Sequence, residues 1–212
     1  HDLRTPLTSI SGNAGVLMRD GENLSAEHRS RIYRDIYDDS MWLINLVENL
    51  LSITRMEGQG VHLHMETELL EEVIDEAMRH INRRHEHHTI RVNQVGDYIL
   101  ADMDARLIIQ VITNLVDNAV KYRRDGCRRL VNSSQEVASA VTEGSHHGPG
   151  IPDESKEKIF EMFYTTGHKS ADGKRGMGLG LPLCRAKMSA HKGTIQVLDN
   201  NTAGSIFRLT LP

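Results

Sequence analysis

Apolar residues with heptad spacing form two runs in the first quarter of this 212-residue chain, and they predict two helices. The first run is Leu3, Leu7, Ile10, Ala14 and Leu17, and the second is Ile32, Ile36, Asp39, Leu43, Leu46, Leu50 and Ile53. Gly21-Glu22-Asn23 separates the helices, and Ser25 can cap the second, which is expected to extend to about Met56. A hairpin of two helices is too thin to bury both runs, so we expect two copies to form a four-helix dimer. The plainer alternative is a coiled-coil linker that only dimerises.

A nucleophile stands at the start of the first predicted helix. His1 takes a solvent-facing b position if Leu7 is an a position, and a neutral imidazole nitrogen is a competent nucleophile near neutral pH. Asp2 can accept the proton of the far ring nitrogen or fix the tautomer, and Thr5 lies one turn on, where its hydroxyl can orient a water. Pro6 has no N–H for the carbonyl of Asp2, which predicts a bend beside the nucleophile. These residues predict phosphoryl transfer only if the rest of the chain supplies an ATP site.

The glycines of Gly58-Gln59-Gly60 mark the expected boundary between two domains, so we assign residues 1–57 to the hairpin, 58–60 to a hinge and 61–212 to a second domain. In the second domain the pattern predicts helices at 68–82, 104–122 and 181–191. It predicts strands at 61–66, 89–95, 98–103, 194–198 and 205–211. This mixture favours an α/β sandwich, and hence an α+β chain. A histidine group suggests zinc, although neighbouring Arg and Glu residues favour a solvated turn; the group is His80, His85, His87 and His88.

The predicted helix at 104–122 carries polar residues on a face of its own. Asn114 and Asn118 are four residues apart, with Lys121 and Tyr122 one turn further on. Amide oxygens are hard ligands that suit Mg²⁺, and a lysine can meet a phosphate as a point charge. The opposite, buried face is predicted to contain Ile108, Val111, Ile112, Leu115 and Ala119. The pattern therefore indicates a nucleotide site, with a plain polar helix face as the alternative.

Two glycine-rich segments follow. Gly148-Pro149-Gly150 suits a turn that approaches a flat base closely, and Gly176-Met177-Gly178-Leu179-Gly180 predicts a lid that leads into the N-terminus of the helix at 181–191. Between them, Phe160 and Phe163 predict a short amphipathic helix. The spacing of the second segment is not that of a dinucleotide fingerprint.

Five segments, in order, resemble the transmitter core of sensor histidine kinases over the whole chain: HDLRTPL, NLVDNAVKY, HGPGIP, KIFEMFY and GMGLGL. HDLRTPLTSISG, WLINLVENLLSITRM and LPLCRAKMSAHKGTI are most similar to the Kdp-type kinases of potassium regulation. The resemblance implies a helical dimerisation hairpin followed by an ATP-binding domain of the Bergerat type, which is shared with gyrase, Hsp90 and MutL.

The resemblance also implies roles. His1 would accept the phosphoryl group of ATP with help from Asp2, and Thr5 matches the position associated with dephosphorylating the partner. Mg²⁺ would be held by Asn114 and Asn118. The implied partners are a second copy of the chain and a response-regulator receiver domain, whose aspartate takes the phosphoryl group. The implied nucleotide contacts are Asn114, Asn118, Lys121, Tyr122, His146, Gly148, Gly150, Gly176, Gly178, Leu179 and Gly180.

One stretch departs from the family pattern. Where the family has an aspartate that bonds the adenine amino group, this chain has His146, which can accept one hydrogen bond but lacks a carboxylate's charge and geometry. Residues 123–145 also lack the apolar alternation of the two strands expected there, with only a weak alternation at 137–141. Three explanations of this departure remain open: a reading-frame error, a degenerate ATP site and an authentic divergent segment. If the segment is authentic, the central sheet is expected to be poorly ordered there.

Composition and charge narrow the classes of protein to which this chain can belong. A net charge of −4 argues against a nucleic-acid surface, no apolar run approaches the roughly 20 residues of a membrane span, and Cys127 and Cys184 fit a reducing compartment. No signal peptide opens the chain, and its first residue already belongs to a motif. We therefore expect a fragment: the cytoplasmic part of a bacterial sensor anchored in the inner membrane, without membrane contact of its own.

The leading functional hypothesis is an ATP-dependent protein histidine kinase. The runner-up is a pseudokinase, a hairpin that dimerises and docks a response regulator without using ATP. A third hypothesis is an ATPase of the gyrase or Hsp90 type, against which the HDLRTPL segment on a dimerising hairpin weighs.

Overall fold

The computed structural model describes residues 3–57, 62–84, 90–95, 98–121, 129–136, 139–146, 150–166, 178–200 and 204–212. The chain divides into two compact units, residues 1–51 and 52–212. His1, Asp2 and the predicted hinge at 58–60 lie outside the described residues, and so does the bend predicted from the carbonyl of Asp2. Within the described ranges, no helix is long and apolar enough to cross a membrane.

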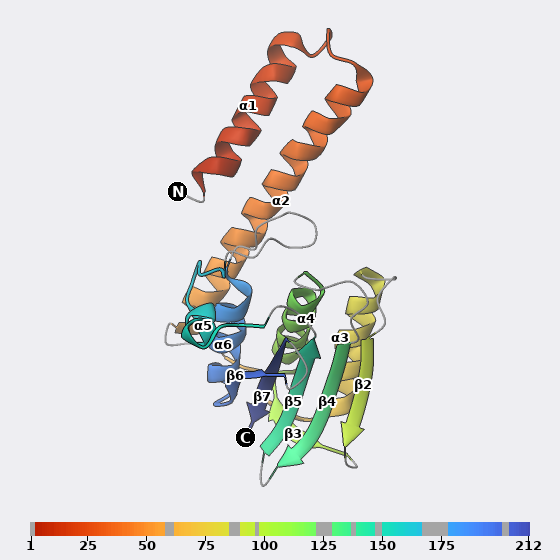
Figure 1. Cartoon of the computed structure of the whole chain (residues 1–212), viewed down its shortest axis with the longest axis vertical. Helices are drawn as coiled ribbons and strands as arrows, with labels where there is room; N and C mark the ends of the chain where they lie inside the picture. The colour runs from red at the N-terminus through yellow and green to blue at the C-terminus, as the bar shows by residue number, and fades with distance from the viewer. Residues whose placement is uncertain are drawn as a thin grey trace. The chain divides into compact units, whose positions relative to one another are not determined.

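Helices α1 (Arg4–Asp20) and α2 (Ala26–Glu57) form an antiparallel hairpin, and the first unit contains α1 and the part of α2 up to Leu51 (Figure 1). The Gly21 N–H donates to the carbonyl of Leu17 at 3.0 Å, which closes the last turn of α1. Ser25 caps α2 as predicted, because its hydroxyl accepts the His28 N–H at 3.2 Å and its carbonyl accepts the Arg29 N–H at 3.0 Å.

The hairpin exposes many of its apolar side chains. Leu3 and Leu7 of α1 are about half exposed, at 48% and 54%. Exposed apolar residues also run along α2, namely Tyr33, Tyr37, Met41, Ile44, Val47 and Leu51. Contiguous apolar surface of this kind marks a site for a further partner.

A small two-stranded sheet joins β1 (Glu66–Leu69) and β3 (Leu100–Met103), and it flanks α3 (Leu70–Arg84) and α4 (Ala105–Lys121). The strand predicted at 61–66 is wrong, since residues 62–65 have no regular structure and β1 begins at Glu66. Pairing fixes the strand, because β1 lies antiparallel to β3 with Glu66 opposite Met103. The alternation of polar and apolar residues at 61–66 predicts a strand there, but it does not show which residues have a pairing partner.

The main sheet has five strands in the order β2 (Ile90–Val95), β4 (Arg129–Glu136), β5 (Ser139–His146), β7 (Ser205–Leu211) and β6 (Thr194–Asp199). The β2–β4 pair is parallel and the others are antiparallel. The expectation of poor order within 123–145 is wrong for β4 and β5, which pair along their length from Arg129 opposite His146 to Glu136 opposite Ser139. Backbone hydrogen bonds build these ladders without an apolar pattern in the sequence.

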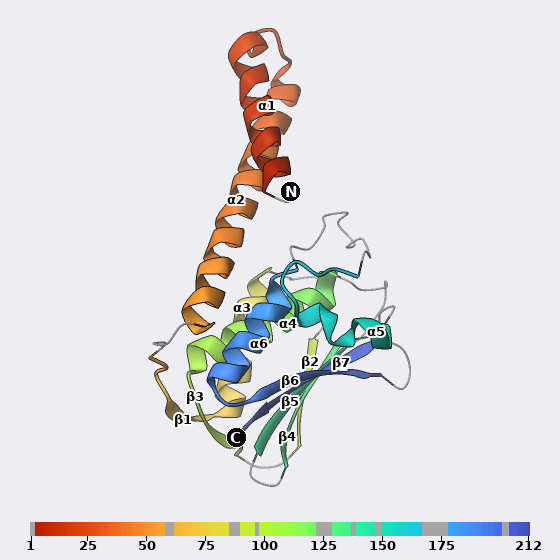
Figure 2. The ribbon, with the colours of Figure 1, turned by 90° about the vertical axis from the view of Figure 1, so that its left-hand side faces the viewer.

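Three helices, α3, α4 and α6 (Gly180–Ala190), cover one face of the main sheet (Figure 2). On α4 the predicted buried face is confirmed, except that Ala119 is only half-buried. Strand β7 alternates so that every second side chain is buried against this layer. The buried core includes Ile74, Ala77 and Ile81 of α3, Ile108, Val111 and Ile112 of α4, Cys184 and Met188 of α6, and Phe207, Leu209 and Leu211 of β7.

A short α5 (Asp153–Lys156) and a 3-10 turn, η1 (Lys158–Phe160), follow the first glycine segment. The helix predicted to contain both Phe160 and Phe163 is wrong for Phe163. Glu161 is extended, with φ −83° and ψ 144°, so the helical stretch ends at Phe160. Phe160 is buried, whereas Phe163 is exposed.

Candidate functional site

Helix α4 packs against α6, and this packing places Asn118 at the start of α6. A Cβ added to Gly180, the first residue of α6, would lie 3.8 Å from Asn118 Nδ2. One turn earlier on α4, the side chain of Asn114 hydrogen-bonds Cys184 of α6. Because the first N–H groups of a helix have no partners within it, an anion that binds them would lie next to Asn118.

Cys184 is a fully buried thiol. Burial raises its pKa to about 12, against the opposing effects of Lys187 and of the Asn114 hydrogen bond. The thiol donates to the carbonyl of Val111 at 3.8 Å. Cys184 therefore links α6 to α4 at both Val111 and Asn114.

The opposite end of the α4–α6 pair is held by His191. Its Nε2 accepts the Asp104 N–H at 3.0 Å, so Nδ1 carries the proton and donates to the Lys187 carbonyl at 2.7 Å. Asp104 in turn caps α4 by accepting the Leu107 N–H at 3.3 Å, and its other oxygen accepts the His64 N–H at 3.2 Å. The ring is 1% exposed, so this neutral histidine links the end of α6 to the start of α4.

Lys187 is an unusual buried cation on α6. Its side chain is 2% exposed, and its ammonium donates to the Oε1 of Gln110 on α4. Burial lowers the pKa of Lys187, and Cys184 opposes that effect. Sequence reasoning missed this residue, which sits in an otherwise apolar helix face.

The lid segment enters the described residues at Gly178. Gly178 has φ +64°, and a Cβ there would lie 2.7 Å from Phe163 C and 2.7 Å from Tyr164 O. The Phe163 N–H donates to the Gly178 carbonyl at 2.9 Å, and Phe163 itself has φ +66°. Only glycine fits at 178, because both the backbone angle and the close approach exclude a side chain.

The first glycine segment passes close to the start of β7. Gly150 has φ +76°, and a Cβ on it would lie 3.7 Å from the carbonyl oxygen of Gly204. Nearby, Lys156 of α5 binds Asp153 at 2.6 Å and Asp199, at the end of β6, at 2.7 Å. The side-chain hydrogen bond from Lys156 lowers the pKa of Asp153. The segment after the glycines is thus tied to the β6–β7 end of the sheet.

Ser205 is a candidate ligand contact that sequence reasoning missed. It is 1% exposed, and its hydroxyl has no hydrogen-bond partner in the described part of the chain. Leaving a buried hydroxyl without a partner costs about 1–3 kcal/mol, so a bound ligand or water is its natural partner. Across the β5–β7 ladder Ser205 lies opposite His146, which places the two positions on one face of the sheet. The available signal was a polar residue that begins the buried row continued by Phe207, Leu209 and Leu211.

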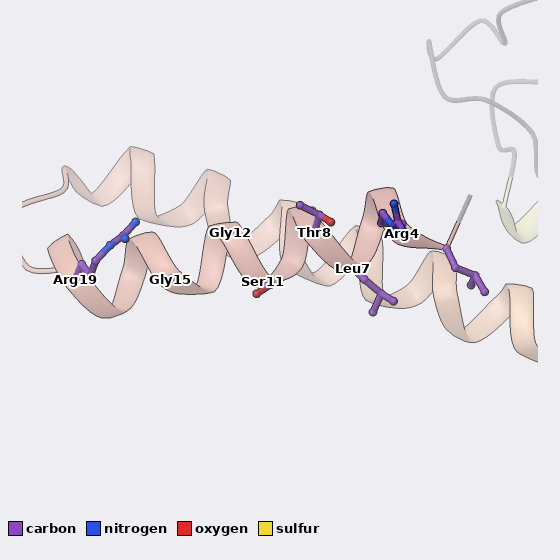
Figure 3. Close-up of a pocket in the computed structure, with 8 residues that line it drawn as sticks. Arg4, Leu7, Thr8, Ser11, Gly12, Gly15 and Arg19 are labelled. Carbon is purple, nitrogen blue, oxygen red and sulfur yellow. The ribbon is translucent and has the colours of Figure 1, made fainter. Parts of the chain in front are cut away.

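A groove of about 800 Å³ runs along one face of α1 (Figure 3). Small side chains line its length, Leu3 and Leu7 give it apolar surface, and Arg4 and Arg19 stand at its two ends. The remaining lining residues are Thr8, Ser11, Gly12 and Gly15. Thr5, beside this groove in sequence, is exposed in the first turn of α1.

Family models match both parts of the chain. Residues 103–212 match the histidine kinase-, DNA gyrase B- and HSP90-like ATPase family, and residues 1–59 match the His Kinase A phospho-acceptor domain. The second match decides between a kinase and an ATPase of the gyrase or Hsp90 type. The chain belongs to the sensor histidine kinase family.

Relatives of this histidine kinase chain include the sensor protein KdpD of Clostridium acetobutylicum, which is 36% identical over 212 residues. The alignment covers the whole chain but 24% of that protein, so the chain spans about a quarter of its relative's length. The Acinetobacter baumannii histidine kinase AdeS is 26% identical with a TM-score of 0.77, covering all of this chain and 96% of that one. Histidine kinase ThkA, solved in complex with the response regulator TrrA, is 25% identical with a TM-score of 0.78, covering all of this chain and 59% of that one. The predicted family, the resemblance to Kdp-type kinases and the α+β fold are confirmed, and nothing in these comparisons favours a pseudokinase.

Several predicted site residues of the kinase fall outside the described residues, namely His1, Asp2, Tyr122, Gly148 and Gly176. Lys121 ends α4 and His146 ends β5. Leu179, which precedes α6, is 1% exposed and therefore belongs to the core. The structure brings Asn118 and Gly180 together, and it separately brings Gly150 close to the residue before Ser205.

Of the four histidines considered for zinc, only His80 lies in the described residues, where it faces Glu76 at 3.2 Å. Among the ranges that the structure describes, no group of three or more histidine, cysteine or acidic side chains could hold a metal ion.

Proposed function

We propose that this chain is the catalytic core of a homodimeric histidine kinase that transfers the γ-phosphoryl group of ATP to His1 and then to an aspartate of a response regulator. The observation that carries the proposal is a phospho-acceptor motif in the same chain as Asn118, which lies against the first residue of α6. A helix N-terminus with an amide beside it suits a polyphosphate.

The nucleotide would lie between the α4 face and the lid. Its phosphates would meet the N-terminal N–H groups of α6, Gly176 and Gly178 of the lid, and Lys121. Mg²⁺ fits the donor set, because Asn114 and Asn118 are both half-buried, Asn118 lies beside the start of α6, and amide oxygens are hard ligands. When bound, the ion supplies neutralisation of the charge on the phosphate oxygens.

The base would lie at the other end of the site. Gly148 and Gly150 would let the backbone approach the flat ring, with Tyr122 nearby. Ser205 would supply the buried hydroxyl and His146 the group that replaces the family's aspartate.

The chemistry at His1 needs positioning more than covalent assistance. A lone pair of the neutral ring attacks the γ-phosphorus, a nitrogen–phosphorus bond forms, and the bond to the bridging oxygen of ADP breaks. Asp2 takes the proton of the other ring nitrogen, so the ring does not keep a full positive charge. In a separate reaction, Thr5 would orient a water that hydrolyses the phosphoryl group on the response regulator.

The hairpin is proposed to bind two kinds of partner, a second copy of the chain and a receiver domain. Exposed apolar residues along α2 favour a second copy of the chain and a four-helix dimer. The α1 groove, close in sequence to His1, would receive the receiver domain, and the similarity to ThkA, solved with TrrA, supports that class of partner.

The chain is proposed to be the cytoplasmic part of a longer, membrane-anchored sensor. Its span of a quarter of a KdpD sensor protein supports the presence of further domains in the parent. Residues 1–57 would serve phosphotransfer and dimerisation, 61–212 would bind ATP, and 58–60 would be the hinge that lets the nucleotide reach His1.

Titration calorimetry with a non-hydrolysable ATP analogue tests the nucleotide site. The chain should bind it with micromolar affinity in the presence of Mg²⁺ and more weakly without it. Asn118→Ala should abolish detectable binding, whereas Asn45→Ala, which removes an exposed asparagine of α2, should leave it unchanged. Equal binding by the Asn118→Ala variant, or no binding by the folded chain, would contradict the proposal.

A further inference from the structure

A row of polar residues joins α4 to α6 within an otherwise apolar helix pair, and we call this row the polar seam. The two helices pack side by side on the same face of the main sheet (Figure 2). The seam consists of four residue pairs that follow one another along the helices: Asp104 with His191, Gln110 with Lys187, Asn114 with Cys184, and Asn118 with Gly180. The first three pairs are hydrogen-bonded, and the fourth is the close approach at the start of α6.

Lys187 is the member of the seam that the stability of the fold does not explain. It is buried, its ammonium donates to the Oε1 of Gln110, and among the described residues no carboxylate is paired with it. An ammonium buried with one neutral hydrogen bond costs stability, and an apolar side chain of the same length would fill the space at lower cost. The lysine therefore calls for a role other than stabilisation.

A hydrogen bond between two helices fixes their register more sharply than apolar packing does. Apolar attraction has no direction, so apolar faces can pack in more than one register, whereas a buried polar group must meet its partner. The seam ends where Asn118 lies against the first residue of α6. A shift of α6 along α4 would therefore move the N-terminal N–H groups of α6 away from the asparagines.

We propose that Lys187 and Cys184 are positioning residues of the nucleotide site, which hold the asparagine face of α4 in register with the N-terminus of α6. The proposal rests on the proposed function, because it needs a nucleotide that contacts both helices. Lys187 acts through its contact with Gln110. Cys184 acts through its contacts with the Val111 carbonyl and the Asn114 side chain.

Calorimetry of the full chain with Mg²⁺ and a non-hydrolysable ATP analogue, together with urea unfolding, tests the role of Lys187. Lys187→Met should weaken binding by about tenfold even though it stabilises the fold. Gln110→Met should weaken binding by a similar factor while it destabilises the fold, because it leaves the ammonium without a partner. Both variants lose the same contact, so the double variant should bind no more weakly than either single variant.

The Gln110→Met variant also separates positioning from charge. It keeps the ammonium of Lys187, so a loss of binding cannot come from lost attraction between a lysine and the phosphates. The exposed Lys158 gives the matched charge control, and Lys158→Met should change the dissociation constant by less than about twofold.

Cys184 is tested by a pair of variants of similar size. Cys184→Ala removes the contacts to Val111 and Asn114 and should weaken Mg²⁺-dependent binding by about tenfold or more. Cys184→Ser keeps a group that can donate and accept, so it should recover most of the affinity. Met188→Leu is the control at a buried apolar position of α6 outside the seam, and it should leave binding unchanged.

The outcomes separate this proposal from the proposed function. No binding by the folded wild-type chain would overturn both. Wild-type binding that survives in Lys187→Met and Gln110→Met would overturn the role of Lys187 alone, and equal binding by Cys184→Ala and Cys184→Ser would overturn that of Cys184. Binding that falls only where stability falls would overturn the whole proposal, whereas weaker binding by a stabilised Lys187→Met chain would support it.

Discussion

The buried ring of His191 accepts a hydrogen bond at 3.0 Å from the backbone N–H of Asp104, a residue 87 positions earlier in the chain. The same ring donates to the carbonyl of Lys187 at 2.7 Å, so it joins the end of α6 to the start of α4. The spacing between these helices sets where Asn118 meets Gly180.

Replacing His191 should therefore destabilise the second unit. His191→Ala removes two hydrogen bonds and leaves a cavity, and we expect a loss of about 2–4 kcal/mol in the free energy of unfolding. Urea unfolding of the full chain measures it. The exposed His62 is the matched control, and His62→Ala should change stability by less than about 0.5 kcal/mol. Similar values for the two variants would show that the His191 bonds carry no stability.

Replacing the buried Lys187 with an apolar residue should stabilise the second unit. The buried ammonium donates to the side-chain oxygen of Gln110, and among the described residues no carboxylate is paired with it, so it loses hydration that one neutral hydrogen bond does not restore. Lys187→Met keeps the length of the side chain and should raise the free energy of unfolding at neutral pH by about 1–2 kcal/mol. The exposed Lys158 gives the control, and Lys158→Met should have little effect. A destabilised Lys187→Met chain would contradict this account.

The same lysine predicts a pH dependence. Burial lowers the pKa of Lys187 below its ordinary value of 10.5. Between the lowered pKa and 10.5 the unfolded chain holds a proton that the folded chain has released, so the free energy of unfolding rises with pH in that window. Below the lowered pKa the full penalty remains. Urea unfolding from neutral to alkaline pH should show this rise as a wild-type contribution that Lys187→Met lacks, and parallel curves would exclude it.

Gly178 should not tolerate a side chain. Its φ of +64° and the 2.7 Å approach of Phe163 C to an added Cβ both oppose alanine. Gly178→Ala should lower the free energy of unfolding by about 1–3 kcal/mol and weaken binding of the ATP analogue, because Gly178 lies just before the N-terminus of α6. Gly144→Ala is the control in β5, where an added Cβ meets nothing within 4 Å. Equal effects of the two substitutions would refute the steric argument.

The hairpin should lose its partner copy when its exposed apolar row is charged. Tyr37, Ile44 and Leu51 are spaced by seven residues on α2 and are 64%, 49% and 49% exposed. The double variant Tyr37→Glu with Ile44→Glu should shift the chain from dimer to monomer in sedimentation equilibrium. Arg34→Glu, at an exposed polar position, should remain dimeric. A dimer that survives the double variant would place the interface elsewhere.

Local periodicity was enough to predict the longer helices of this chain. The apolar positions of α4 recur at helical spacing, and Ser25 stands where the second helix begins, so both could be placed without knowledge of the fold. The strands were harder. Arg129–Glu136 contains arginine, asparagine, serine and glutamine in place of an alternating apolar row, and its strand depends on backbone ladders with β2 and β5.

The site divided in the same way. Asn114 and Asn118 were predicted from their spacing on one helix, and the glycine segments from their composition. Ser205, His191 and Lys187 were missed because each has its significance only through a distant part of the chain: His146, Asp104 and Gln110, respectively. A buried serine or lysine carries no local signal that separates it from an exposed one.

Phosphorylation of His1 is the most direct test of the central claim. The full-length chain, incubated with Mg²⁺ and ATP labelled in the γ-phosphoryl group, should gain a label that survives alkali, is lost in acid and maps to His1 by peptide mass. His1→Gln should remain unlabelled, and Asn118→Ala should lose at least about 100-fold of the labelling rate, since a rate loss of that size corresponds to about 2.7 kcal/mol of transition-state stabilisation. A folded, dimeric wild-type chain that binds the ATP analogue yet acquires no acid-labile label would contradict the assignment of this chain as a kinase.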